Sequence, residues 1–412
     1  MQGGTMEGYK ANNVEFVGYC DLDKKPGFKM GIKVVDGQWY MYAGHLWHSG
    51  WSIINVTDPA NPKIEKFIPG PANTFTLNVQ VADDLLITSL EPTYPGWGAT
   101  DETPDEGVII WDIKDPLNPR KLSHWRTGGK GIHRVYYDGG RYMYCPCYMK
   151  GYTGLFLVIM DIIDPEHPVE VSRWFLPEQF SAGGADTRKY YDGDFYGIHD
   201  VYAEGNSVYI AYGRAGMVIL DITDITNPTL VGHATLGTLF ASVIGLHTAM
   251  PINDQYAIFT TEGIDEDCTE PLNLSGIIDI SDETHPRVIS LFPLPEPPED
   301  AGYTNFKDHG GRFAPHNIHQ QHHNPWLMEQ KNLVYETYFN AGLRIYDISD
   351  PYMPKEVGYF LPDDPKERLG VLPATLVTQS EDVLVDARGF AYIMDKNHGM
   401  YIVRYTGDKQ SS

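Results

Sequence analysis

Short runs in which apolar and polar residues alternate follow one another along the whole chain, and turns rich in Asp, Asn, Gly and Pro separate them. Alternation with a period of two predicts β-strands that bury one face. One phrase returns six times: WSIINVTDPANP at 51, VIIWDIKDPLNP at 108, LVIMDIIDPEHP at 157, MVILDITDITNP at 217, GIIDISDETHP at 276 and LRIYDISDPYMP at 343. Each copy is a β-branched run, a turn built on Asp and usually Pro, and a second apolar run, which predicts a strand, a turn and a strand.

A second pair of apolar runs precedes each phrase. GIHDVYAEGNSVYIAY at 197 and VLVDARGFAYIMD at 383 show the pattern, with a Glu-Gly or Arg-Gly turn between two runs. Such a turn is a β-hairpin signal. Each unit therefore has four strands, and a period near 58 residues fits seven units into 412. We predict an all-β, seven-bladed β-propeller that forms a single domain over residues 1–412.

The two ends of the chain are expected to share a blade. The segment VEFVGYCDL at 14 resembles outer-strand copies such as VGYFLP at 357, and a truncated repeat, MYIVRYTGD, ends the sequence. We therefore expect the strand around 14–22 to pair with the strand around 400–405. Closure by terminal strands removes exposed sheet edges.

The third-strand phrases MVILDITD and LRIYDISD resemble the LVIVD-repeat family, and the resemblance extends over essentially the whole chain. Two copies depart from the pattern, with Ile225 and Glu283 where Pro usually stands. The resemblance implies a propeller fold and implies no particular activity.

Net charge and cysteine content narrow the classes of function. The chain has 31 Lys and Arg against 55 Asp and Glu, a net charge of −24. Such a chain repels nucleic acids and anionic membranes. Four Cys and an opening segment without an apolar stretch lead us to expect a cytoplasmic protein. The expected partner is a small-molecule substrate, and a homo-oligomer is possible.

Histidine recurs at one position of the repeat. Alignment on the second strand of each unit places His133, His199 and His247 at the start of the innermost strand, in the words GIH, GIH and GLH. In the sixth unit the word NIH selects His319, and an insertion leaves three alternatives open: His316, His322 and His323.

Innermost propeller strands converge around a central channel, so side chains at one repeat position face a common centre. The other three units present Gly31, Asn78 and Asp382 there. Several imidazoles on one centre can hold Fe, Mn, Zn or Cu. We predict that His133, His199, His247 and His319 bind one divalent metal ion. A ring of channel histidines bonded to water is the alternative.

Long inserted segments are predicted at the same end of the channel. They span 91–107, 177–197, 263–274 and 295–313, and those at 190–196 and 303–312 are expected to shape a pocket. The candidate substrate-binding residues are Trp97, Tyr191, Phe195, Tyr303 and Phe306. The candidate catalytic residues are Asp382, Tyr196, His309 and Arg312.

These features favour a metal-dependent lyase that acts on a small oxygen-bearing molecule, either aromatic or sugar-like. In such a reaction the metal ion polarises an oxygen atom of the substrate, while a Tyr or His side chain removes or donates a proton. One alternative is an iron oxygenase that cleaves a C–C bond, because carotenoid-cleaving oxygenases are similar in placing four histidines around iron on a seven-bladed propeller. The other is a non-catalytic interaction scaffold.

Overall fold

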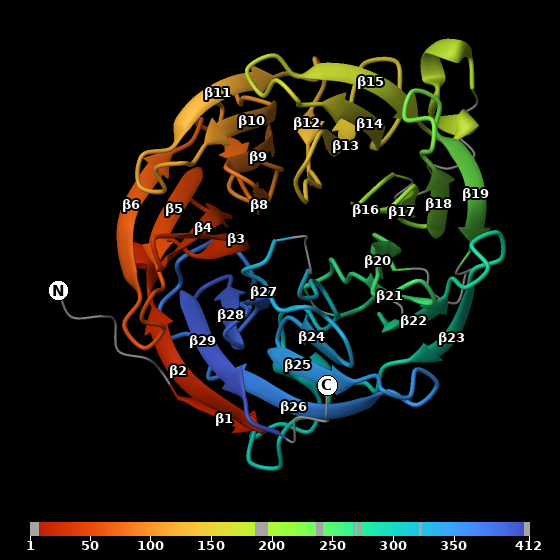
Figure 1. Cartoon of the computed structure of the whole chain (residues 1–412). Coiled ribbons are helices and arrows are strands. Elements are labelled where there is room, and N and C mark those ends of the chain that lie inside the picture. Colours follow the sequence, from red (N-terminus) through yellow and green to blue (C-terminus); the bar gives the residue numbers. More distant parts are fainter. Residues whose placement is uncertain are drawn as a thin grey trace.

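Seven β-sheets stand in a ring around a central axis in the computed structural model, which describes residues 8–185, 197–235, 242–266, 268–270, 273–320 and 324–407 (Figure 1). This confirms the predicted all-β, seven-bladed propeller. Helical structure in these ranges is limited to η1 (Leu22–Lys24), η2 (Pro177–Gln179), η3 (Ser181–Gly183) and α1 (Phe306–His309). None of these helices has the length or apolarity needed to cross a membrane.

Blades 1 to 3 follow the chain from the inside of the ring to its rim. Blade 1 contains β3 (Gly27–Val35), β4 (Gln38–His45), β5 (Gly50–Asn55) and β6 (Lys63–Pro69). Blade 2 contains β7 (Thr74–Phe75), β8 (Val79–Ala82), β9 (Leu85–Pro92), β10 (Gly107–Asp112) and β11 (Arg120–Trp125). Blade 3 contains β12 (Gly131–Ile132), β13 (Tyr142–Tyr148), β14 (Phe156–Asp161) and β15 (Val169–Trp174).

Blades 4 and 5 repeat this order. Blade 4 contains β16 (Asp200–Glu204), β17 (Ser207–Ala211), β18 (Met217–Asp221) and β19 (Thr229–Ala234). Blade 5 contains β20 (Leu246–Pro251), β21 (Tyr256–Thr261), β22 (Ser275–Asp279) and β23 (Arg287–Leu291). All neighbouring strands within the blades are antiparallel.

Blades 6 and 7 both take their outermost strand from the N-terminal segment. Blade 6 contains β24 (Leu333–Thr337), β25 (Leu343–Asp347), β26 (Lys355–Pro362) and β1 (Tyr9–Asn12). Blade 7 contains β27 (Ser380–Val385), β28 (Phe390–Asp395), β29 (Met400–Tyr405) and β2 (Val14–Cys20). The pairing of β2 with β29, from Val14 opposite Tyr405 to Cys20 opposite Met400, confirms the predicted closure. The sequence did not predict that β1 also pairs with β26.

The recurrent Asp holds the turn between the third and fourth strands. Asp58, Asp115 and Asp350 each accept a hydrogen bond through Oδ1 from the backbone N–H two residues on, at 3.0–3.1 Å. Asp224 and Asp282, which precede Ile225 and Glu283, make the same bond. The turn therefore depends on the carboxylate and tolerates the loss of Pro.

At five junctions, the outer strand of one blade touches this turn in the next blade. The carbonyl of the residue after the Asp accepts a hydrogen bond from an outer-strand serine of the preceding blade: Ser123 to Pro165, Ser172 to Ile225 and Ser290 to Pro351, at 2.6–2.7 Å. At two other junctions a glycine replaces the serine. A Cβ at Gly232 would lie 1.8 Å from the Glu283 oxygen, and one at Gly18 would lie 2.1 Å from the Pro59 oxygen.

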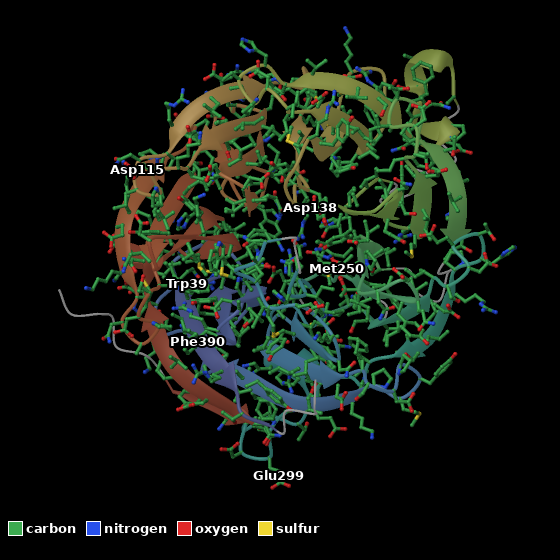
Figure 2. The ribbon with its side chains drawn as sticks, in the orientation of Figure 1. Trp39, Asp115, Asp138, Met250, Glu299 and Phe390 are labelled. Atoms are coloured by element: carbon green, nitrogen blue, oxygen red, sulfur yellow. The ribbon has the colours of Figure 1, made fainter. Side chains whose placement is uncertain are left out.

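Apolar side chains fill the space between neighbouring sheets, as Figure 2 illustrates. The largest buried cluster runs through blades 3 to 6 and includes Ile159, Val218, Ile277 and Val334. The middle strands of a blade, such as β14 and β18, are buried on both faces. Their sequences are therefore nearly continuous runs of apolar residues.

Truncation tests the double closure. Removing residues 1–12 deletes the pairing of β1 with β26, and removing residues 1–21 also deletes the longer pairing of β2 with β29. Each lost ladder hydrogen bond costs about 0.5–1.5 kcal/mol. We expect the melting temperature of the full chain to fall with the first deletion and much further with the second. Equal melting temperatures for the two deletions would contradict this.

One buried carboxyl makes stability depend on pH. Glu336 on β24 is fully buried, only its Oε2 accepts a hydrogen bond, from Ser275, and burial raises its pKa from 4.5 to about 8. Between these pH values the folded protein keeps a proton that the unfolded chain has released. The free energy of unfolding therefore falls as pH rises from 4.5 to 8, by at most about 1.4 kcal/mol per pH unit from this group. Glu336→Gln should flatten this slope in denaturant titrations, and an unchanged slope would refute the assignment.

Candidate functional site

The innermost strands are irregular at the level where the candidate histidines lie. The register between β20 and β21 shifts between Leu246 and Thr248, and that between β27 and β28 shifts between Ser380 and Asp382. In blade 3 the strand β12 stops at Ile132, and pairing resumes only at the bridge of Tyr136 with Tyr144. Such bulges and breaks turn side chains away from the regular alternation.

Four imidazole rings form a chain across blades 3 to 6. The ring centres of His133 and His199 are 4.8 Å apart, those of His199 and His247 are 4.1 Å apart, and those of His247 and His316 are 4.8 Å apart. His199, His247 and His316 are buried, whereas the His133 side chain is 19% exposed. Three of the four histidines chosen from the sequence thus lie side by side. The fourth member is His316, one of the alternatives left open.

A carboxylate that the sequence analysis missed lies among these rings. Glu262 Oε2 is 3.6 Å from His199 Nε2 and 3.9 Å from His247 Nε2, and its Oε1 is 3.7 Å from His316 Nε2. His199, His247 and Glu262 form a buried group whose potential ligand atoms all lie within 4.8 Å of one another. Two donors bound to one tetrahedral ion at 2.0–2.2 Å are separated by about 3.4 Å. The donor set could therefore hold a metal ion after small side-chain shifts.

Burial favours the neutral form of the buried imidazoles, which is the form that binds a metal ion. Burial, followed by the charge of Arg134, lowers the pKa of His316 well below 6.5. Burial is also the main cause of the strongly lowered pKa values of His199 and His247. The carbonyl of Glu381 fixes the ring of His316, whose Nδ1 lies 2.6 Å away and leaves Nε2 toward Glu262. A neutral ring oriented by a backbone carbonyl is the usual arrangement for a ligand histidine.

Two buried arginines border the cluster. Arg312 Nη1 lies 3.2 Å from Glu262 Oε1, and Arg134 Nη2 lies 3.0 Å from His247 Nε2. Arg134 also contacts Asp200 and Asn317 through Nη1. Burial raises the pKa of Glu262, and the two arginines oppose that effect. A metal bound by His247 Nε2 would replace its contact with Arg134.

A cavity of about 360 Å³ lies over the cluster. Histidines 133, 199 and 316, both arginines, Glu262 and Glu381 contribute its polar surface. The rest of the lining is mainly apolar or aromatic: Phe28, Leu46, Phe75, Leu77, Tyr94, Pro95, Trp97, Tyr148, Leu155, Val243, Ile244 and Ile264. Several of these residues come from the segment after β9, from that after β21 and from the connection between β19 and β20. The cavity suits a small, largely apolar molecule with a polar end.

Two of the other predicted residues reach this cavity. Trp97 and Arg312 both line it, with the guanidinium carbon 4.8 Å from the Trp97 ring centre. Asp382 does not line it, because its carboxylate is buried against Lys29 at 3.0 Å. Tyr191, Phe195 and Tyr196 lie outside the described residues, as do the alternatives His322 and His323.

The segment 303–312 contributes only Arg312 to the lining. Phe306 is buried against Tyr338 and Leu361, and Tyr303 packs against the edge of that cluster. His309 stacks on Tyr303, with ring centres 3.9 Å apart, and pairs with Asp364 at 2.9 Å. The structure therefore does not bring Tyr303, Phe306 or His309 to the cavity.

His319 makes structural contacts instead of joining the cluster. Its Nε2 bonds to the carbonyl of Met328 at 2.8 Å, and its Nδ1 accepts the N–H of Val385 at 3.1 Å. Both ring nitrogens are therefore occupied by the backbone. The sequence favours His319 over His316 because its word NIH matches the GIH and GLH of the other units better than PHN, the word around His316. The insertion in the sixth unit obscures the true alignment.

Two glutamates of the site stand at the ends of second strands. Glu91 is near the end of β9 and contacts His133 Nδ1 at 2.5 Å, and Glu262 directly follows β21. In an antiparallel pair, the end of the second strand lies beside the start of the first. The only sequence signal for them is a Glu near the end of the second strand, in the words SLEP and TTEG.

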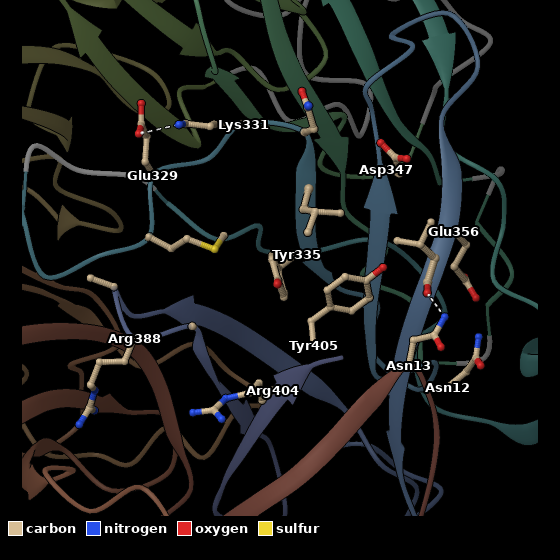
Figure 3. A pocket seen from close by; sticks show the side chains of 16 residues that line it. Asn12, Asn13, Glu329, Lys331, Tyr335, Asp347, Glu356, Arg388, Arg404 and Tyr405 are labelled. Atoms are coloured by element: carbon tan, nitrogen blue, oxygen red, sulfur yellow. Dashed lines mark hydrogen bonds and ion pairs between the residues drawn. The ribbon is translucent and has the colours of Figure 1, made fainter. Parts of the chain in front are cut away.

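A second, larger recess lies between blades 6 and 7, at the end of the strands where β24 begins and β29 ends. It has a volume of about 1180 Å³, and Figure 3 shows its polar lining, which includes Asn13, Lys331, Glu356 and Arg404. The histidine cluster lies at the opposite end of the inner strands, so the two cavities are separate.

Comparison with known proteins supports the fold. The LVIVD repeat matches residues 198–235 and 332–361. The chain carries LVIVD repeats. No curated protein matches the sequence significantly.

Three solved structures illustrate the similarity. A hypothetical selenium-binding protein from Sulfolobus tokodaii is 12% identical, with a TM-score of 0.53 over 88% of this chain and 87% of that one. Sqt1 from Saccharomyces cerevisiae is 10% identical, with a TM-score of 0.51 over 95% and 87%. A protein from Lactobacillus plantarum is 12% identical, with a TM-score of 0.51 over 96% and 99%. At such low identity these likenesses show the fold alone.

Substitution separates the roles of the two histidines of blade 6. His319→Ala leaves two buried backbone groups without partners and should lower the free energy of unfolding by about 2 kcal/mol or more, with zinc affinity unchanged. His316→Ala should weaken zinc binding, since it removes a donor 3.7 Å from Glu262. Denaturant titration and calorimetric zinc titration measure the two effects. Weaker zinc binding by His319→Ala alone would reverse the assignment.

Proposed function

We propose that this propeller is a metal-dependent enzyme that acts on a small oxygen-bearing organic molecule in the cavity over His199, His247 and Glu262. The observation that carries the proposal is this buried donor set at the floor of a mainly apolar cavity. His316 supplies a fourth donor. A divalent ion held by these residues would polarise an oxygen atom of the substrate.

His133 has the surroundings of a general base. It lines the cavity, its side chain is partly exposed, and the Glu91 carboxylate contacts its Nδ1. This contact orients the ring and occupies Nδ1, so Nε2 is the nitrogen left to accept a proton. We therefore assign His133 to proton transfer and not, as the repeat pattern suggested, to metal ligation.

The reaction class that we favour is elimination. His133 removes a proton from the carbon next to a carbonyl group, and the electron pair of that C–H bond forms a C=C bond. The C–O bond on the neighbouring carbon breaks, its electron pair leaves with the oxygen, and His133 passes the proton that it removed to the departing group. Arg134 and Arg312 hold the negative charge that develops on the carbonyl oxygen.

Metal analysis of the purified full-length chain tests the proposal. We expect about one divalent ion per chain, and we expect His199→Ala and Glu262→Gln to lose most of it. His285→Ala provides a matched control, because His285 lies exposed on an outer turn and pairs only with neighbouring residues. Metal content should be unchanged in this control.

The identity of the metal distinguishes the alternatives. Zinc, manganese or magnesium supports a lyase, whereas redox-active iron or copper points to the oxygenase alternative. Metal content that is equally low in the wild type and both site variants, even after incubation with zinc, would refute a metal enzyme and leave the scaffold.

A further inference from the structure

Arg312 lines the cavity and has a buried hydrogen-bond donor without a partner among the described residues. Its side chain is 2% exposed, its Nη1 contacts Glu262 at 3.2 Å, and its Nε contacts Glu266 at 3.3 Å. Within the described part of the chain, its Nη2 meets no hydrogen-bond acceptor. A buried donor without a partner is energetically unfavourable, so a bound acceptor there stabilises the site.

The guanidinium group is held rigidly for this task. It lies between two aromatic rings, 4.8 Å from the centre of Trp97 and 5.2 Å from that of Phe339. Arg344 is also buried and also has an unpartnered Nη2, but it packs between Phe306 and Tyr359 and does not line the cavity. The position of Arg312 at the cavity wall therefore distinguishes the two.

Arg134 adds a second donor to the same wall. It lines the cavity, is 2% exposed, and its Nε meets no acceptor among the described residues. Apart from the histidines, the charged residues of the lining are these two arginines, Glu262 and Glu381, whose formal charges cancel. A bound divalent ion would leave the lining with an excess of two positive charges.

Both observations identify the polar end of the ligand. We propose that the cavity binds a monocarboxylic acid with an apolar or aromatic body, whose carboxylate accepts hydrogen bonds from Arg312 and Arg134. The apolar body packs against Phe28, Phe75 and Leu77. The volume of about 360 Å³ lies at the small end of the range of roughly 300–1,000 Å³ for ligand pockets. The inference deepens the proposed function by naming its substrate class, and the excess charge rests on the metal proposed there.

Calorimetric binding of 3-phenylpropanoate and its neutral amide, 3-phenylpropanamide, tests the proposal. The full chain is titrated after loading with zinc and, separately, in EDTA. We expect the zinc-loaded chain to bind the acid at least tenfold more tightly than the amide. A smaller preference should persist in EDTA, because the arginines remain. Equal affinities for the acid and the amide in both conditions would overturn the proposal.

Substitution of Arg312 shows whether the preference belongs to this residue. Arg312→Gln should greatly reduce the preference for the acid in EDTA, because only Arg134 remains, and Arg312→Lys, which keeps the charge but loses the planar fork, should reduce it less. Arg344→Lys is the matched control at a buried arginine outside the cavity, and it should keep the full preference. Thermal melting checks that each variant folds. If Arg312→Gln does not fold, Arg312→Lys provides the test.

The outcomes distinguish the carboxylate-binding proposal from the proposal of a metal-dependent enzyme. A preference that is undiminished in folded Arg312→Gln, or in folded Arg312→Lys where Arg312→Gln does not fold, would mean that another group binds the carboxylate, which overturns the proposal. If zinc does not bind but the preference for the acid depends on Arg312, the inference holds and the metal enzyme is refuted. If zinc binds at His199 and the acid has no advantage, the inference fails and the metal site stands.

Discussion

The contact between one blade's outer strand and the next blade's turn determines the geometry of the whole ring. An Asp carboxylate fixes this turn in blades 1 to 6, so the carbonyl of the next residue is held in a similar position in each of them. The preceding blade meets that carbonyl with a serine hydroxyl or with the bare backbone of a glycine. This contact recurs at five junctions and helps to hold neighbouring blades in the same relation to one another. The histidines of blades 3 to 6 lie close enough to share a centre.

The repeat phrases were sufficient to predict the blades, because each copy contains the same turn residues and the copies recur at a nearly constant spacing. The closure of β2 on β29 was also predictable from the likeness of outer-strand words. The pairing of β1 with β26 was not, since four residues without a repeat partner carry too little pattern. The second N-terminal pairing depends on where the chain runs in space, which local pattern does not contain.

Prediction of the site stopped at the irregular part of the inner strands. His133, His199 and His247 follow the repeat, so alignment found them. His316 and Glu262 stand beside an insertion and beyond a strand end, where register changes and side-chain direction no longer follow alternation. To place these two side chains, one needs to know how the irregular inner strands pair with their neighbours, and the sequence pattern does not show this. The structure supplies this information by placing the Glu262 carboxylate against His199 and His316.

The double closure also determines the order in which the ring can form. The strands β1 and β2 are made first, yet their partners are β26 and β29, more than 340 residues later in the chain. At roughly 5–20 residues per second, synthesis leaves these strands unpaired for tens of seconds. Contacts of such long sequence separation are slow to form. The strands β1 and β2 therefore complete the ring late, and until they pair, the edges of blades 6 and 7 are most open to aggregation.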